Sequence, residues 1–98
     1  MLYAIFCLDR PDRGHLRQDL LDEHRAHFKQ AGPAVRAAGP LFNDDGSPQC
    51  GSMIVLEAAS AEEARAFITS DPYARNGLFE QITVRRWAWL SGAGKPET

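Results

Sequence analysis

The opening segment 2–8, Leu-Tyr-Ala-Ile-Phe-Cys-Leu, is apolar at every position. Side chains alternate between the two faces of a strand, so both faces of a strand formed here would be apolar. This pattern predicts a central strand that is covered on both sides. Ninety-eight residues make one small domain, and the two helices of such a domain cover one face of a sheet. The simplest source of the second cover is a partner subunit.

The segment 16–31 has the apolar spacing of an amphipathic helix. At 100° per residue its apolar stripe comprises Leu16, Leu20, His24, Phe28, Ala31 and Val35. His24 lies near the centre of this stripe, where a polar residue needs an explanation. Gly32-Pro33 is expected to end or kink the helix, because proline has no amide hydrogen to donate. A further helical turn is expected over 34–38.

Turn residues and apolar runs predict the remaining elements. We expect a short edge strand at 39–42, a loop at 43–48, a buried strand at 52–57, a second helix that ends near Ser70, a connecting turn at 71–77 and a long strand at 79–89. Ser60 is the expected N-cap of the second helix, with Glu63 at the capping-box position three residues later.

This order of strand, helix, strand, strand, helix, strand is typical of ferredoxin-like α+β domains. In that fold a four-stranded antiparallel sheet carries the helices on one face and leaves the other face open. The open face would account for the missing cover on segment 2–8, and two sheets packed face to face would give a dimeric α/β barrel. We therefore predict a domain over residues 1–90, a flexible tail over 91–98, and a homodimer.

Charge and cysteine content argue against several classes of partner. The net charge is −2, so neither nucleic acid nor an anionic membrane surface is an expected partner. No apolar run reaches the roughly 20 residues of a membrane span, and no secretory signal is recognised. Cys7 and Cys50 lack CxxC or zinc-site spacing. We expect two free thiols in a reducing cytoplasm rather than a disulfide.

Six short motifs follow one another along nearly the whole chain. They are the strand 1–5, His24 in the first helix, Gly39-Pro40-Leu41, Gly51-Ser52, Ser70-Asp71-Pro72-Tyr73 and Asn76-Gly77-Leu78-Phe79-Glu80. In this order they resemble the YciI-like (YCII-related) family within the dimeric α/β-barrel group. The chain departs from the family pattern at Gly32-Pro33, where the family helix usually continues.

The resemblance implies a small homodimeric enzyme with a catalytic His–Asp pair, which His24 and Asp71 would supply. The predicted topology makes the first and last strands antiparallel neighbours. The end of the second helix then lies beside the start of the first, so the two side chains can meet. Asp9, Arg10 and Tyr73 belong to the same end of the domain and are the candidate substrate-binding residues. A carboxylate against an imidazole fixes its tautomer and raises its basicity, as a general base requires.

Each of these residues also has a structural interpretation. His24 could be a core histidine with a satisfied hydrogen bond, and Asp71 a turn residue before a proline. His24, His27 and Asp71 could in principle bind a metal, but only His15 remains as a further ligand, so no metal is expected.

Other reactive or aromatic residues are expected to have packing roles. Cys7 lies in a buried strand, where an inert thiol is the expectation. Four residues of the last strand, Gln81, Arg85, Trp87 and Trp89, are expected at the subunit interface rather than in a ligand site.

One proton shuttle without a cofactor suits proton abstraction followed by elimination or isomerisation, the chemistry of a lyase or an isomerase. The substrate would be a small organic molecule. Its class, a cyclic or aromatic-derived acid, rests on analogy with muconolactone isomerase-like enzymes and cofactor-free monooxygenases. No glycine-rich phosphate loop is present in the sequence, so nucleotide binding has no support. The alternative is a non-catalytic dimeric module that binds a small molecule or acts as an accessory subunit.

Overall fold

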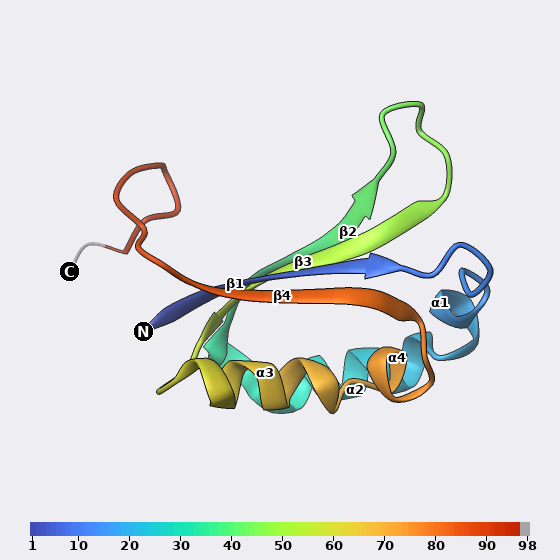
Figure 1. The fold of residues 1–98 in the computed structure, drawn as a ribbon. Helices are drawn as coiled ribbons and strands as arrows, with labels where there is room; N and C mark the ends of the chain where they lie inside the picture. Colours follow the sequence, from blue (N-terminus) through green and yellow to red (C-terminus); the bar gives the residue numbers. More distant parts are fainter. Residues whose placement is uncertain (97–98) are drawn as a thin grey trace.

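The computed structural model describes residues 1–96, which form a four-stranded antiparallel sheet with helices on one face (Figure 1). The strands are β1 (Leu2–Asp9), β2 (Val35–Phe42), β3 (Gln49–Glu57) and β4 (Phe79–Trp87); the helices are α1 (Leu16–Asp19), α2 (Leu21–Ala31), α3 (Ala61–Thr69) and α4 (Pro72–Arg75), with a 3-10 turn η1 at Gly32–Ala34. The strand order is β2-β3-β1-β4, and β1 pairs antiparallel with both β3 and β4. The predicted ferredoxin-like fold is confirmed.

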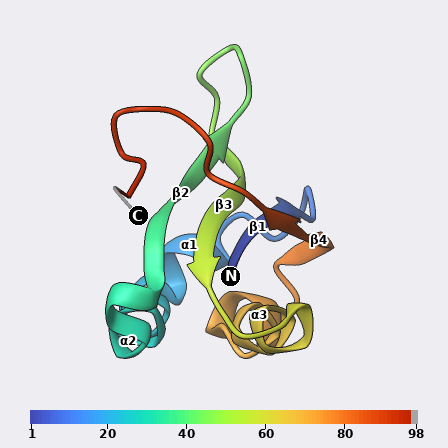
Figure 2. The ribbon, with the colours of Figure 1, turned by 90° about the vertical axis from the view of Figure 1, so that its left-hand side faces the viewer.

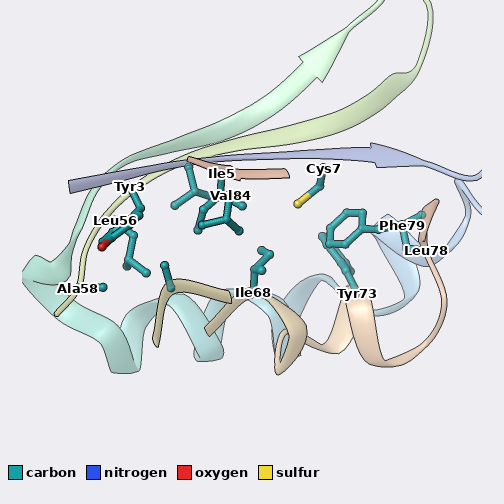
Figure 3. Close-up of a cluster of buried hydrophobic side chains, with 12 residues drawn as sticks. Tyr3, Ile5, Cys7, Leu56, Ala58, Ile68, Tyr73, Leu78, Phe79 and Val84 are labelled. Carbon is teal, nitrogen blue, oxygen red and sulfur yellow. The ribbon is translucent and has the colours of Figure 1, made fainter. Parts of the chain in front are cut away.

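The hydrophobic core lies between the sheet and the helices. Seen along the sheet, α2 lies beneath β2 and α3 beneath the β1–β4 side (Figure 2). The inward face of β1 contributes Tyr3, Ile5 and Cys7, and α3 contributes Ile68, as Figure 3 shows. At the far end of the core Tyr73, Leu78 and Phe79 pack together beside the short helix α4; this is the end at which the candidate site lies.

The opposite face of the sheet carries several exposed apolar side chains, and no helix of residues 1–96 covers it. Its exposed members come from three neighbouring strands: Phe6 and Leu8 on β1, Met53 on β3 and Trp87 on β4. Phe6 pairs with Met53 and with Thr83 in the two ladders, so these side chains share one face. We call these four apolar residues the open face. The prediction that the helices leave the second apolar side of β1 uncovered is therefore confirmed.

The predicted continuous helix over 16–31 is wrong in one respect, because it is divided into α1 and α2 at Leu20, whose backbone angles are φ −110° and ψ 13°. The hydroxyl of Tyr73 donates a 2.7 Å hydrogen bond to the carbonyl oxygen of Arg17. In a continuous helix that oxygen would accept from the amide of Leu21. A side chain inserted into the helical hydrogen-bond ladder is a common cause of such a break.

The predicted helical turn over 34–38 is also wrong. Gly32 ends α2 with a positive φ of 57°, which a residue without a Cβ adopts readily, and the chain then enters β2 at Val35. In segment 35–38, backbone pairing with β3 outweighs the local preference for a helical turn. The predicted edge strand at 39–42 is confirmed but begins four residues earlier, and Pro40 lies on the sheet edge as expected.

The second half of the chain follows the predictions more closely. Ser60 caps α3 by accepting a 3.1 Å hydrogen bond from the amide of Glu63, and the helix ends at Thr69. The expected turn over 71–77 contains the short helix α4, and β4 stops at Trp87, two residues before the predicted end. Residues 97 and 98 of the predicted tail lie outside the described residues. No helix in residues 1–96 has the length and hydropathy needed to cross a membrane.

Candidate active site

The imidazole of His24 lies against the carboxylate of Asp71. His24 Nδ1 is 3.0 Å from Oδ1 and 2.9 Å from Oδ2 of Asp71. The Asp71 side chain is fully buried, whereas the His24 side chain remains 20% exposed. Because a carboxylate accepts hydrogen bonds, we assign the proton of the neutral imidazole to Nδ1, which leaves the lone pair on Nε2. The two residues are 47 positions apart in the sequence, and the fold brings them into contact.

Asp71 is fully buried and is the N-cap of α4. Its backbone is extended (φ −60°, ψ 135°), Pro72 follows at the first helical position, and Oδ1 accepts a 3.1 Å hydrogen bond from the amide of Tyr73. A buried carboxylate without partners would be strongly unfavourable. The amide and the imidazole together satisfy it, so Asp71 both caps a helix and orients His24.

Two aromatic rings hold the imidazole in place. The ring of Tyr73 stacks on His24 with 4.0 Å between centroids and an interplanar angle of 11°, and Phe28 lies on another side at 4.5 Å. Within residues 1–96, Nε2 of His24 makes no hydrogen bond. His24 is instead one of the residues that line a cavity of about 600 Å³ between α1, α2, β2 and β3.

Tyr73 also lines this cavity, although its hydroxyl is already committed. It donates to the carbonyl oxygen of Arg17 at 2.7 Å. Burial raises the pKa of Tyr73, and the nearby Asp71 carboxylate raises it further, although the charge of Arg17 acts in the opposite direction. Tyr73 therefore acts as a neutral ring that supports His24, not as a proton donor to a ligand.

Arg17 and Asp9 form a buried ion pair at this end of the molecule. Asp9 was singled out from the sequence, but Arg17 was not. Arg17 donates from Nε and Nη2 to the two carboxylate oxygens of Asp9, at 2.7 and 2.8 Å, and from Nη2 to Ser52 Oγ at 3.0 Å. Arg17 and Ser52 line the cavity. The spacing of Arg17 and His24, seven residues or two helical turns, could have indicated that they share a face.

Asp9 and Arg10, the other two candidate substrate-binding residues, do not line the cavity. Asp9 is buried behind Arg17 and is absent from the residues that line the cavity. Its contact with the site is therefore indirect. Arg10 is exposed and also lies outside the lining, with its backbone amide bonded to the carbonyl oxygen of Leu78. The geometry gives no support for Arg10 as a ligand contact.

The remaining histidines and the cysteines have separate surroundings. His27 Nε2 donates to the carbonyl oxygen of Phe67 at 2.8 Å, and no cluster of three or more His, Cys, Asp or Glu within residues 1–96 is placed to hold a metal. His15 is exposed at the cavity wall. Both cysteines are free. Burial raises the pKa of the Cys7 thiol to about 12, which makes it a poor nucleophile.

The structure is similar to that of a solved enzyme. The dehydrochlorinase TftG of Burkholderia phenoliruptrix AC1100, which acts on 5-chloro-2-hydroxyhydroquinone and was solved with 2,5-dihydroxybenzoquinone, superposes with a TM-score of 0.80. It is 30% identical to this chain, and the alignment covers 90% of this chain and 94% of TftG.

The amino-acid sequence is also similar to those of known proteins. Proteins named YciI from Escherichia coli O6:H1 and Shigella flexneri are each 32% identical over 92 residues, which is 87% of this chain and 94% of theirs. The profile of the YCII-related domain matches residues 1–88. With the fold and these matches in agreement, the chain belongs to the YCII-related, YciI-like family.

Proposed function

We propose that the protein is a cofactor-independent enzyme in which His24 moves a proton on a small organic substrate, as the base and then as the acid. The observation that carries the proposal is the His24–Asp71 contact at 2.9 Å beside the cavity. Asp71 holds the proton on Nδ1, so the Nε2 lone pair is available to the substrate. A cavity of about 600 Å³ suits a small molecule rather than a polymer.

The reaction class that fits this site is elimination, with isomerisation as its near relative. Dehydrochlorination, the reaction of TftG, removes one proton and one chloride ion from the substrate. One imidazole can take up that proton and then release it to solvent, while chloride leaves with the electron pair of the broken C–Cl bond. The cavity wall combines aromatic and apolar side chains such as Phe28 and Ile54 with several polar and charged ones, as suits a cyclic substrate that carries polar groups. We therefore propose a small hydroxylated ring compound as the substrate.

We also propose that the functional unit is a homodimer formed through the open face. Phe6 and Leu8 are 40% and 45% exposed at the centre of the sheet, where a single chain has nothing to cover them. A second copy of the same face would bury them, which is the isologous arrangement of a two-fold dimer. Such a dimer would be the α/β barrel expected from the sequence. The cytoplasmic location stays a prediction.

Chloride release from 5-chloro-2-hydroxyhydroquinone tests the proposed activity. His24→Asn keeps a donor near the position of Nδ1 but removes the base, and it should lower kcat/KM by roughly 10²–10⁴-fold, the usual contribution of a general base. His27→Gln is the matched control, because its amide can still donate to the Phe67 carbonyl; it should retain activity. Equal turnover by His24→Asn and the wild type would contradict the proposal. Ligand binding without turnover in any variant would favour the non-catalytic module.

A further inference from the structure

The Arg17 guanidinium has donors that the protein does not use. Three of its five N–H groups are committed: Nε–H and one Nη2–H to Asp9, and the other Nη2–H to Ser52. Within residues 1–96 the two hydrogens on Nη1 have no hydrogen-bond partner, yet no buried side-chain nitrogen or oxygen in that range is left unsatisfied. Nη1 is therefore accessible, and because Arg17 lines the cavity, we infer that it faces the cavity.

Ser52 provides a second donor beside it. Its Oγ accepts from Arg17 Nη2 at 3.0 Å, so its own hydroxyl hydrogen remains available to donate elsewhere. Ser52 is almost fully buried and lines the same cavity. A polar residue in this position of the apolar strand β3 places a hydroxyl next to the guanidinium edge.

Both donors are fixed relative to the base. The ring of Tyr73 lies 4.0 Å from the His24 ring and 5.3 Å from Arg17 Cζ, so the sum of these two distances limits the separation of base and guanidinium. The bidentate contact with Asp9 holds the guanidinium plane rigidly. A small ring compound could contact Nε2 of His24 with one edge and Arg17 with another.

We propose that Arg17 Nη1 and Ser52 Oγ form a binding site for a phenolate or enolate oxygen of the substrate. This inference rests on the proposed function, since the oxygen becomes negative when His24 Nε2 removes a proton. The proton goes to Nε2, and the electron pair of the broken bond stays on the substrate and is delocalised onto that oxygen. Fixed donors aimed at a developing oxyanion are among the most effective devices for stabilising such an intermediate. Arg17 and Ser52 would select substrates that carry an acidic hydroxyl or a carbonyl group.

Binding of 4-nitrophenol tests the site without any turnover. Its phenolate has a visible absorption band that its phenol form lacks, and 4-nitroanisole is a neutral probe of similar shape. The wild type should bind the phenolate, which raises the band at a pH where the free probe is mostly protonated. Ser52→Ala and Arg17→Lys should each weaken phenolate binding on the order of tenfold, as expected for a hydrogen bond to a charged group. Affinity for 4-nitroanisole should be nearly unchanged.

Controls separate this site from its alternatives. Arg65→Lys and Ser91→Ala repeat the two substitutions at exposed positions away from the cavity and should bind like the wild type. Ser52→Ala removes one hydroxyl from a strand that should still fold, which guards against misfolding of Arg17→Lys. Failure of the wild type to bind the phenolate, or equal affinity of the wild type, Ser52→Ala and Arg17→Lys for it, would overturn the proposal.

Failure of the proposed activity would give a different pattern. His24→Asn should bind the phenolate nearly as well as the wild type, because the oxyanion donors remain. If the probe binds through Arg17 and Ser52 while chloride release never occurs, the oxyanion site stands and the proposed reaction fails. If chloride release depends on His24 but phenolate binding is unaffected by Ser52→Ala and Arg17→Lys, the proposed reaction is supported and the proposed oxyanion site is refuted.

Discussion

At the scale of single residues, the tautomer of His24 depends on the hydrogen-bond acceptors of the Asp71 carboxylate. Both carboxylate oxygens lie within 3.0 Å of Nδ1, and Oδ1 also accepts from the amide of Tyr73. The buried carboxylate thus serves two donors from different elements. Any substitution that changes its acceptor pattern should change which nitrogen of His24 carries the proton.

Asp71→Asn should reverse the tautomer of His24. The amide of Tyr73 needs an acceptor, so the asparagine Oδ1 will face it and Nδ2 will face the imidazole. Nδ1 must then accept, and the proton moves to Nε2, where it blocks the base. Nitrogen-15 NMR of the imidazole at a pH where the ring is neutral distinguishes the two forms. An Nε2-protonated ring already in the wild type would contradict the assignment.

The sequence predicted the His24–Asp71 contact and the place of Tyr73 at the site, but only part of their surroundings. Helical periodicity placed His24 on the buried stripe, the family resemblance indicated Asp71 as its partner, and the predicted topology allowed the two side chains to meet. Arg17 was missed because an arginine near the start of a helix is usually solvated, and its burial depends on Asp9 accepting both of its bonds. Ser52 was expected only as the first residue of the strand 52–57, because no pattern in the sequence shows that its hydroxyl meets an arginine 35 residues away.

Cys7 provides a prediction about pH. Burial raises its pKa to about 12, so between about pH 9 and 12 the folded protein keeps a proton that the unfolded chain loses. Stability should therefore fall with rising pH in that window, by up to about 1.4 kcal/mol per pH unit from this group. Below pH 9 the contribution is constant.

Denaturant unfolding at pH 8, 9.5 and 10.5 measures the slope for the wild type and for Cys7→Ala. The variant is less stable throughout because it leaves a cavity, but its stability should fall less steeply with pH. Equal slopes in the two proteins would show that the Cys7 thiol ionises normally.

At the scale of elements, the break between α1 and α2 is the feature that sequence periodicity could not foresee. The apolar stripe continues through both helices, since Leu16, Leu20 and Phe28 all pack against the core. Local pattern therefore predicts one helix. The break accompanies a hydrogen bond from Tyr73, 56 residues from Arg17 in the sequence, and no local signal reports such a contact.

Tyr73→Phe should loosen α1 while leaving the ring stacked on His24. Loss of the 2.7 Å hydrogen bond to the Arg17 carbonyl should cost about 1 kcal/mol of unfolding free energy. Amide exchange in α1 should accelerate more than in α3. Tyr3→Phe is the matched control, because its hydroxyl has only a 4.0 Å contact with the sulfur of Met1. Equal protection of α1 in wild type and Tyr73→Phe would show that the bond does not hold this helix.

The start of the edge strand β2 also could not be predicted from local sequence alone. Val35 begins β2 where a helical turn was expected, because the ladder with β3 satisfies backbone groups that a short isolated helix would leave unpaired. Strands β1, β3 and β4 and helix α3 were predicted because their apolar patterns and caps are local. Boundaries that depend on a neighbouring strand were not.

At the scale of the whole molecule, the open face is the feature that a single chain leaves unexplained. Its apolar residues come from β1, β3 and β4. Phe6 and Met53 are direct ladder partners, and Trp87 pairs with Leu2 on the same face of β1. Exposed apolar side chains gathered on one face of a sheet commonly mark a protein–protein interface. The segment 2–8 predicts such a surface by itself, because its side chains are apolar on both faces of the strand.

Phe6→Asp should convert the proposed dimer to a monomer. A carboxylate at the centre of the open face would lose its hydration in the dimer, which costs far more than placing a charge on an exposed surface. Sedimentation velocity at micromolar concentration should show a dimer for the wild type and a monomer for the variant. Ala66→Asp, on the exposed side of α3, is the charge-matched control and should remain dimeric. A wild type that sediments as a monomer at this concentration would refute the dimer.

The central claim is that His24 and Asp71 act as one unit on a proton of the substrate, and a double-mutant cycle tests it most directly. The measurement is kcat/KM for chloride release by the wild type, His24→Asn, Asp71→Asn and the double variant. Residues that act as a unit are strongly non-additive, so the double variant should be nearly as active as His24→Asn alone. Losses that simply multiply, or a His24→Asn variant as active as the wild type, would contradict the account.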